Sequence, residues 1–258
     1  SSTYVRNGQS WHITYGTGSA EGFLGKDKFC FGDSEVCVPD QTFGQATSIA
    51  PFFANQPIDG ICGLGFTALA VDHVTPPFIQ AVNENILDKG MFTVYLSHSG
   101  LIVNSYGGTI TYGGLDTENC NDVIAYEPLT SQTYWQFKMT QITVGAYNSG
   151  VRDYQVISDT GTSFIGGPRS VIQGIAKAAN GSYNAQYNSF FVDCDSAPPN
   201  MEITIGSNVY SIMSSNYVVP VGDDACELAL FSFNSGGFGP SWILGDPFIR
   251  QYCNVHDV

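Results

Sequence analysis

The stretch that decides the fold is Val156-Ile157-Ser158-Asp159-Thr160-Gly161-Thr162-Ser163. Its apolar half favours a strand, and its glycine and hydroxyl residues favour a turn. At the strand end, Asp159 can be held in a fixed orientation by the hydroxyls of Thr160 and Thr162 and by the Gly161 backbone N–H. Taken alone, the Asp-Thr-Gly tripeptide favours an ordinary tight turn, so the remaining sequence has to decide whether this carboxylate is structural or catalytic.

The composition indicates an all-β protein with a few short helices. The chain has 258 residues, enough for one large β domain or two ordinary ones, and 43% of them are apolar. Its 29 glycines, 14 tyrosines and 17 phenylalanines accompany short apolar runs between turn residues. Since no apolar run approaches the length of a membrane span, we expect no membrane association.

The charge balance is strongly acidic. Nine Lys and Arg residues face 23 Asp and Glu residues, for a net charge of −14. Nucleic acid is excluded as a partner because phosphate binding requires clustered cations. An acidic working compartment and a merely solvated acidic surface both remain open.

Seven cysteines indicate an oxidising compartment. Cys30 and Cys37 flank a hairpin-like span that a disulfide can clip, and Cys194 and Cys226 can close a longer loop. The odd thiol is assigned to Cys62, which the apolar run around it predicts to be a buried free cysteine. No Cys-x-x-Cys motif and no histidine pair at ligand spacing occurs, so no metal site is expected.

Asn180 begins the sequon Asn-Gly-Ser, which predicts N-glycosylation and supports a secretory route. The chain starts at Ser1 without an initiator methionine or an apolar leader, so we expect a mature or truncated chain.

Alternation and breaker residues predict the main elements. A β-hairpin is expected over residues 11–31 with its tip at 15–19, and a boundary near residues 113–116 is expected to divide the chain into halves 1–115 and 116–258. Further expected elements are a buried strand at 58–66, helices at 76–89 and 168–179, and strands at 91–96, 109–112 and 241–246.

Two segments, Ile61-Cys-Gly63 and Ile243-Leu-Gly245, suggest an internal repeat. Gly245 follows Asp159 by 245 − 159 = 86 residues, and the same offset from Gly63 falls before Ser1. If the chain is a pair of duplicated lobes, a second Asp-Thr-Gly is expected upstream.

Five motifs stand out along the chain: Ile13-Thr-Tyr-Gly-Thr-Gly-Ser19, Ile58-Asp-Gly-Ile-Cys-Gly-Leu64, Asp159-Thr-Gly-Thr-Ser163, Trp242-Ile-Leu-Gly-Asp246 and Phe248-Ile-Arg-Gln-Tyr252. On these motifs the whole chain resembles the pepsin and cathepsin D family of aspartic endopeptidases. The stretches Gly236-Gly-Phe-Gly-Pro-Ser241 and Gln251-Tyr-Cys-Asn254 resemble those of the digestive aspartic proteases of roundworms. The resemblance implies a bilobal pepsin-like β fold, here with an incomplete first lobe, and a cleft roofed by a flap hairpin.

The resemblance also implies the site. Asp159 is expected to be one of two catalytic aspartates, supported by Thr160, Gly161 and Thr162. The flap and the cleft walls are expected to comprise Tyr15, Gly16, Thr17, Phe52, Ile58, Ile61 and Ile157. His12, His73, His98 and His256 are expected to be structural or surface residues.

Two nearby carboxylates share one proton, so one can activate water while the other protonates the peptide carbonyl. This chemistry implies no metal and no cofactor. The expected partners are protein or peptide substrates at acidic pH and pepstatin-like inhibitors, and the expected state is a monomer in the gut lumen or the lysosome.

The sequence departs from the family in lacking the first Asp-Thr-Gly, for which Asp59 is no substitute, and in stopping at Val258. We therefore expect a fragment of an active enzyme, inactive alone. Among disulfides, Cys194–Cys226 matches a pair of the family, Cys30–Cys37 fits a hairpin, and Cys120–Cys253 is inferred from strands expected to meet beneath the lobes.

Three alternatives stay open. The chain could be a non-catalytic homologue that binds peptides or proteins, a homodimer pairing two copies of Asp159 in the manner of retroviral proteases, or a structural secreted β protein. The dimer is disfavoured because the flap and the acid fall in different halves of one chain.

Overall fold

A computed structural model describes residues 1–15, 18–32, 36–54, 57–98, 102, 105–222, 225–234, 236 and 239–258, without the side chains of Tyr15 and Ala54. Strands predominate and the helices are short, as expected for the mostly-β class of the pepsin-like fold. The chain divides into two compact units, Ser1–Gly90 and Met91–Val258. Within the described ranges, every helix is too short or too polar to cross a membrane.

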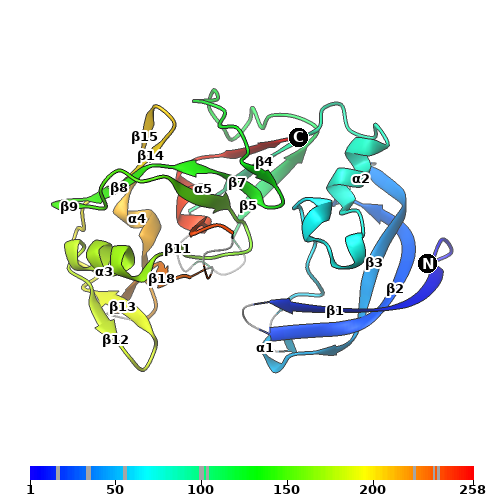
Figure 1. Cartoon of the computed structure of the whole chain (residues 1–258), viewed down its shortest axis with the longest axis horizontal. Coiled ribbons are helices and arrows are strands. Elements are labelled where there is room, and N and C mark those ends of the chain that lie inside the picture. The colour runs from blue at the N-terminus through cyan, green and yellow to red at the C-terminus, as the bar shows by residue number, and fades with distance from the viewer. Residues whose placement is uncertain are drawn as a thin grey trace. The chain divides into compact units, whose positions relative to one another are not determined.

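The first unit is built on one antiparallel sheet in the order β1-β2-β3, drawn in blue in Figure 1. The strands are β1 (Val5–Tyr15), β2 (Gly18–Cys30) and β3 (Cys37–Ile49). Gly22 lies in β2 where a Cβ atom would stand 1.9 Å from the Gln45 carbonyl oxygen, so the close approach of β3 requires glycine there. The predicted hairpin is thus present, but its tip at Gly16 and Thr17 lies outside the described residues.

Short helices follow the sheet, namely α1 (Pro51–Ala54), η1 (Thr67–Leu69), η2 (Val71–His73) and α2 (Pro77–Asn83). Of these, α2 is shorter than predicted. The prediction of a helix to residue 89 was wrong, because Asn85 adopts φ 54° and the Ile86 N–H turns back to the Ala81 carbonyl. A left-handed asparagine with such a bond ends a helix.

The expected buried strand at 58–66 is also absent, and Cys62 is exposed rather than buried. Among the described residues this segment has no strand partner, since the sheet of the first unit contains β1, β2 and β3 alone. The side chains of Ile58 and Ile61 consequently remain 52% and 60% exposed. An apolar sequence run did not suffice to make a buried strand, because burial needs a neighbouring strand or layer to pack against.

The described part of the second unit contains four sheets. A six-stranded sheet has the order β18-β11-β19-β10-β7-β6, and three smaller sheets have the orders β15-β14-β8-β9, β12-β13-β17-β16 and β20-β4-β5. The strands of the largest sheet are β6 (Ser131–Gln132), β7 (Trp135–Met139), β10 (Tyr154–Ser158), β11 (Ile165–Gly167), β18 (Leu230–Ser232) and β19 (Trp242–Leu244).

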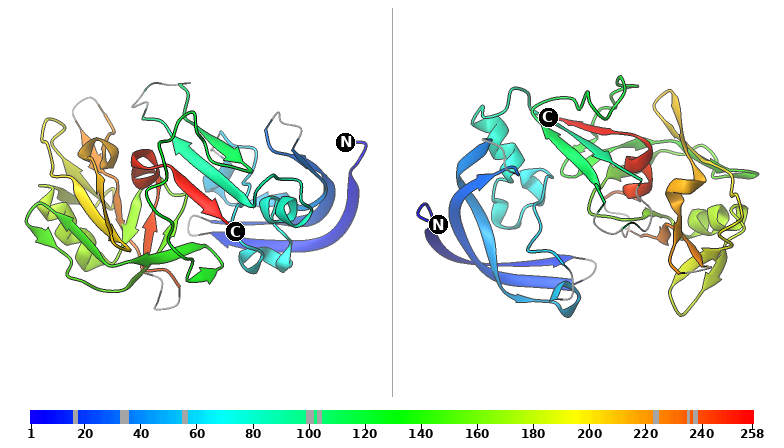
Figure 2. Two further views of the ribbon diagram at one scale, coloured as in Figure 1. Left: turned by 90° about the horizontal axis from the view of Figure 1, so that it is seen from above. Right: turned by 180° about the vertical axis from the view of Figure 1, so that it is seen from behind.

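The smaller sheets complete the unit (Figure 2). Their strands are β4 (Met91–Leu96), β5 (Gly108–Tyr112), β8 (Gln141–Val144), β9 (Tyr147–Asn148), β12 (Ser182–Asn184), β13 (Ser189–Val192), β14 (Met201–Ile205), β15 (Asn208–Ile212), β16 (Val218–Pro220), β17 (Cys226–Leu228) and β20 (Asn254–Asp257). The helices are α3 (Arg169–Ala178), α4 (Ser214–Tyr217) and α5 (Asp246–Gln251).

The core of the second unit lies between these sheets and α3. The helix buries Val171, Ile172, Ile175 and Ala176 on one face, the i, i+3, i+4 pattern of an amphipathic helix. Trp242 on β19 is fully buried in the same cluster. Strand β19 ends at Leu244, earlier than the predicted Asp246, because the Gly-Asp-Pro sequence begins α5 instead.

The compact units differ from the predicted halves 1–115 and 116–258. Strands β4 and β5 precede residue 115 but belong to the second unit, because β20 from the far end of the chain pairs with β4 (β20 in red, Figure 2). The division into two lobes at residue 115 remains a prediction.

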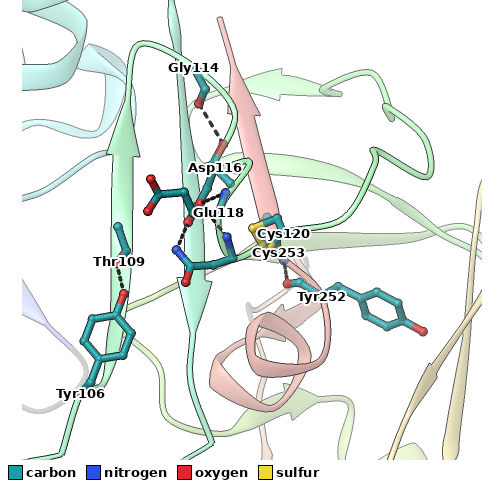
Figure 3. Close-up of a disulfide and its surroundings, with 11 residues drawn as sticks. Tyr106, Thr109, Gly114, Asp116, Glu118, Cys120, Tyr252 and Cys253 are labelled. Atoms are coloured by element: carbon teal, nitrogen blue, oxygen red, sulfur yellow. Dashed lines mark hydrogen bonds between the residues drawn. A yellow bond between two sulfur atoms is a disulfide. The ribbon is translucent and has the colours of Figure 1, made fainter.

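Three disulfides link the cysteine pairs considered from the sequence, Cys30–Cys37, Cys120–Cys253 and Cys194–Cys226. The second joins the segment after β5 to the turn before β20 (Figure 3). Beside it, Asp116 accepts hydrogen bonds from the backbone N–H groups of Glu118 and Asn119 at 3.0 Å each, which shapes the turn leading to Cys120.

Candidate active site

The candidate catalytic residue, Asp159, directly follows the buried strand β10. This strand runs parallel to β19 and antiparallel to β7 inside the six-stranded sheet. Val156 and Ile157 are buried, and the Asp159 backbone N–H donates a 3.1 Å hydrogen bond to the Leu244 carbonyl oxygen. The predicted strand-to-turn transition is therefore present, and two neighbouring strands fix the position from which the carboxylate projects.

Both carboxylate oxygens of Asp159 accept hydrogen bonds from its own turn. The Gly161 N–H donates to Oδ1 at 2.9 Å, and the Thr162 hydroxyl donates to Oδ2 at 2.6 Å. The hydroxyl of Thr160, by contrast, is exposed and forms no hydrogen bond with any residue that the structure describes. Gly161 and Thr162 thus hold the carboxylate, whereas the supporting role expected for Thr160 remains a prediction.

Gly245 allows the turn to pack closely against β19. A Cβ atom on Gly245 would stand 2.0 Å from the Thr162 carbonyl oxygen and 2.4 Å from that of Phe164. The next residue, Asp246, donates its backbone N–H to the Thr162 carbonyl at 3.0 Å. The Ile-Leu-Gly segment identified in the sequence therefore packs directly against the turn that follows Asp159.

A second carboxylate, Asp246, lies partly buried near this turn. Its Oδ2 is 3.7 Å from a guanidinium nitrogen of Arg250, one helical turn later on α5. Burial raises the pKa of Asp246, Arg250 opposes this, and the negative charge of Asp159 adds to the rise. No role was predicted for this pair from the sequence, although its i, i+4 spacing after Gly245-Asp-Pro is a recognisable helix-start signal.

Three more polar residues, Ser158, Asn254 and His256, form a cluster next to Asp159. The hydroxyl of Ser158 donates to Oδ1 of Asn254 at 2.7 Å and lies 3.2 Å from Nε2 of His256. His256 was expected to be a structural or surface residue, and it is buried, with 4% of its surface exposed. No local pattern in the sequence indicates this cluster, because Ser158 and His256 are 98 residues apart.

The remaining predicted site residues are divided between the two units. Tyr15 ends β1 opposite Gly18, and Gly16 and Thr17 lie outside the described residues. Ile157 belongs to the second unit and is only 4% exposed. In the first unit, Phe52 on α1 and the segment carrying Ile58 and Ile61 are exposed. Their roles in a flap and a cleft remain predictions.

Asn180 is exposed in the turn after α3 and adopts φ 59°. Its glycosylation remains a prediction.

Known proteins resemble this chain over its full length. The family described as "Eukaryotic aspartyl protease" matches residues 1–258. Aspartic protease 6 of Caenorhabditis elegans is 53% identical over 261 residues, covering 100% of this chain and 67% of that protein. Aspartic protease 2 of Necator americanus is 42% identical over 261 residues, covering 100% and 61%. Embryonic pepsinogen of Gallus gallus is 36% identical over 264 residues, covering 100% and 65%.

The chain therefore belongs to the eukaryotic aspartyl protease family. It spans 61–67% of the length of these three relatives.

Proposed function

We propose that the chain is the larger part of an aspartic endopeptidase in which Asp159 is one of two catalytic carboxylates. The observation that carries the proposal is the Asp159 carboxylate itself. It projects from the end of a central strand and accepts hydrogen bonds at both oxygens, in a chain that belongs to the aspartyl protease family.

The proposed chemistry needs a second carboxylate close to Asp159. Two such groups cannot both ionise, so they share one proton, as in the pepsin pair. The ionised group takes a proton from a water molecule as that water attacks the peptide carbonyl, and the protonated group donates to the carbonyl oxygen. Gly161 and Thr162 serve this step by keeping the Asp159 oxygens oriented while the proton moves.

The second carboxylate is proposed to come from a part of the protein outside residues 1–258. Asp-Thr-Gly occurs once in the chain, and the relatives are longer than the matched region. We therefore expect residues 1–258 alone to lack proteolytic activity. Substrates are expected to be proteins with large apolar residues flanking the cut, received by Phe52, Ile58, Ile61 and Ile157 under a flap formed by Tyr15, Gly16 and Thr17.

The setting is proposed to be an acidic compartment of the secretory route, the gut lumen or the lysosome, with a monomeric enzyme glycosylated at Asn180. The three disulfides, the exposed sequon and the net charge of −14 support this setting. Pepstatin-like inhibitors are expected to bind at Asp159.

The decisive experiment compares Asp159→Asn with the unmodified protein in its full encoded length. We expect acid peptidase activity that pepstatin inhibits, and a loss of at least about a thousandfold in the variant. Asp153→Asn is the matched control, since Asp153 is an exposed partner of Lys138 at 3.4 Å. Peptide binding without hydrolysis in the unmodified protein would instead support the non-catalytic homologue.

A further inference from the structure

The cluster behind Asp159 joins two strands of different sheets. Ser158 is the last residue of β10 in the six-stranded sheet, and Asn254 and His256 lie on β20, which pairs with β4. The Ser158 hydroxyl contacts both of them, at 2.7 Å and 3.2 Å. One side chain, adjacent in sequence to the candidate catalytic residue, thus ties the end of β10 to β20.

The direction of each hydrogen bond follows from the donors available. Asn254 donates its side-chain N–H to the Tyr252 carbonyl at 2.8 Å, which leaves its Oδ1 to accept from Ser158. The hydroxyl has one proton, so its oxygen can only accept from His256. We therefore assign the His256 proton to Nε2, which leaves Nδ1 as a buried acceptor without a hydrogen-bond partner among the described residues.

The imidazole ring is held by aromatic side chains. It stacks on Phe92 at 4.4 Å between ring centroids with an interplanar angle of 12°, and Trp135 meets it edge-on at 4.9 Å. These contacts fix the ring in the orientation that points Nε2 at Ser158. A hydrogen bond from a ring that cannot rotate is a rigid restraint on its acceptor.

His256 keeps this role in moderate acid. Burial lowers its pKa to about 3, and the backbone carbonyl of Asn254 opposes this only in part. The residues that contact the ring on β4, β7 and β10 are Phe92, Trp135 and Ser158, none of which is charged. The titratable residues on or directly after the surrounding strands are Tyr95, Lys138, Tyr154, Asp159 and Asp257.

We infer that Ser158, Asn254 and His256 are positioning residues for Asp159. They anchor the end of β10 to β20, while Gly161 and Thr162 hold the Asp159 carboxylate itself. The inference rests on the proposed function. Its physical basis is that a displacement of a catalytic group by a fraction of an ångström lowers the rate of the chemical step more than it weakens substrate binding.

The kinetic test uses the protein in its full encoded length. Ser158→Ala is expected to lower kcat about tenfold with KM changed less than about twofold, and His256→Phe, which keeps the ring packing, to lower kcat about threefold or more. Ser158→Thr keeps the hydroxyl and is expected to retain most of kcat. Ser241→Ala is the matched control, because among the described residues the Ser241 hydroxyl bonds just the backbone carbonyl of Gln155 on β10.

A structural test uses residues 1–258 and needs no activity. Nuclear magnetic resonance is expected to show His256 as the neutral Nε2–H tautomer at pH 6. Ser158→Ala is expected to speed hydrogen exchange of the Asp159 amide, which bonds Leu244, about tenfold, and Ser241→Ala to leave it unchanged.

The two tests separate the two proposals. An inactive full-length protein with the expected tautomer and exchange would contradict the proposed function and uphold the anchoring. Unchanged kcat and exchange in Ser158→Ala, or a rise in KM without a fall in kcat, would overturn the positioning role. An Nδ1–H tautomer would do the same, since His256 could not then donate to Ser158.

Discussion

The Thr162 hydroxyl donates a 2.6 Å hydrogen bond to Oδ2 of Asp159, three residues before it in the chain. Together with the 2.9 Å bond from the Gly161 N–H to Oδ1, it gives each carboxylate oxygen a donor from the same turn. The orientation of the carboxylate is therefore set within the four consecutive residues from Asp159 to Thr162, and the surrounding sheet only has to hold those residues in place.

Thr162→Val should separate this hydrogen bond from the volume of the side chain. The variant keeps the branched shape but loses the donor, so we expect kcat to fall about tenfold to a hundredfold in the full-length protein. Thr162→Ser keeps the donor and should retain activity within about threefold. Steady-state kinetics on both variants provide the measurement, and equal losses in the two would show that the hydroxyl is irrelevant.

Gly245→Ala should destabilise the second unit strongly. The added Cβ would meet backbone oxygens of Thr162 and Phe164 at 2.0 and 2.4 Å, and backbone cannot move aside cheaply. We expect a loss of about 3 kcal/mol or more in the free energy of unfolding, measured with urea. Gly114→Ala is the control, because nothing lies within 4 Å of its Cβ position. A loss below about 1 kcal/mol for Gly245→Ala would contradict the packing described.

His256 should make the protein less stable in acid. Its pKa is lowered from 6.5 to about 3 by burial. Between these two pH values the unfolded chain therefore binds a proton at His256 and the folded chain does not. The stabilisation is fully present above pH 6.5 and is lost as pH falls to about 3, by about 5 kcal/mol over the whole window.

His256→Phe keeps an aromatic ring against Phe92 and Trp135 but removes the titration. Urea unfolding between pH 7 and pH 3 should therefore show a shallower loss of stability than in the unmodified chain. Parallel pH profiles for the two proteins would refute the buried neutral state of His256.

Arg250→Gln should cost more stability at pH 7 than at pH 3. Burial already raises the pKa of Asp246, and Arg250 is the group that opposes this, so its removal raises the pKa further. For a raised carboxyl pKa, stability is fully present below the unfolded value of 3.8 and is lost as pH rises through the folded value.

We expect the free energy of unfolding to fall by about 2 kcal/mol at pH 7 and by about 1 kcal/mol at pH 3. The smaller cost at pH 3 comes from losing the hydrogen bond from Arg250 to the Asn216 carbonyl, which does not depend on pH. Lys138→Gln is the control, because the Lys138–Asp153 pair is exposed and worth less than about 1 kcal/mol. Costs that do not depend on pH would show that Asp246 is not the partner that matters.

Local chemistry explains which parts of the fold were predictable. The strand through Val156 and Ile157 and the turn through Gly161 follow from neighbouring residues, and so does the amphipathic helix α3. The segment 58–66 failed as a strand prediction because its apolar residues describe a preference for burial, whereas burial depends on a partner strand. Helix α2 ended early at a left-handed Asn85, a conformation that the sequence permits without requiring.

The sequence by itself determined the mostly-β class, the family resemblance and the choice of Asp159 as the candidate catalytic residue, because each depends on motifs that are contiguous or repeated along the chain. Only the tertiary structure decided that Gly245 packs against the turn after Asp159 and that Asp246 lies close enough to feel the charge of Asp159. It also decided that His256 contacts Ser158, the residue before Asp159. These relationships join residues about 90 positions apart, and pairing of β10 with β19 and of β20 with β4 creates them. A one-dimensional pattern contains no information about which strands will be neighbours, and the support of the candidate catalytic group depends on those neighbours.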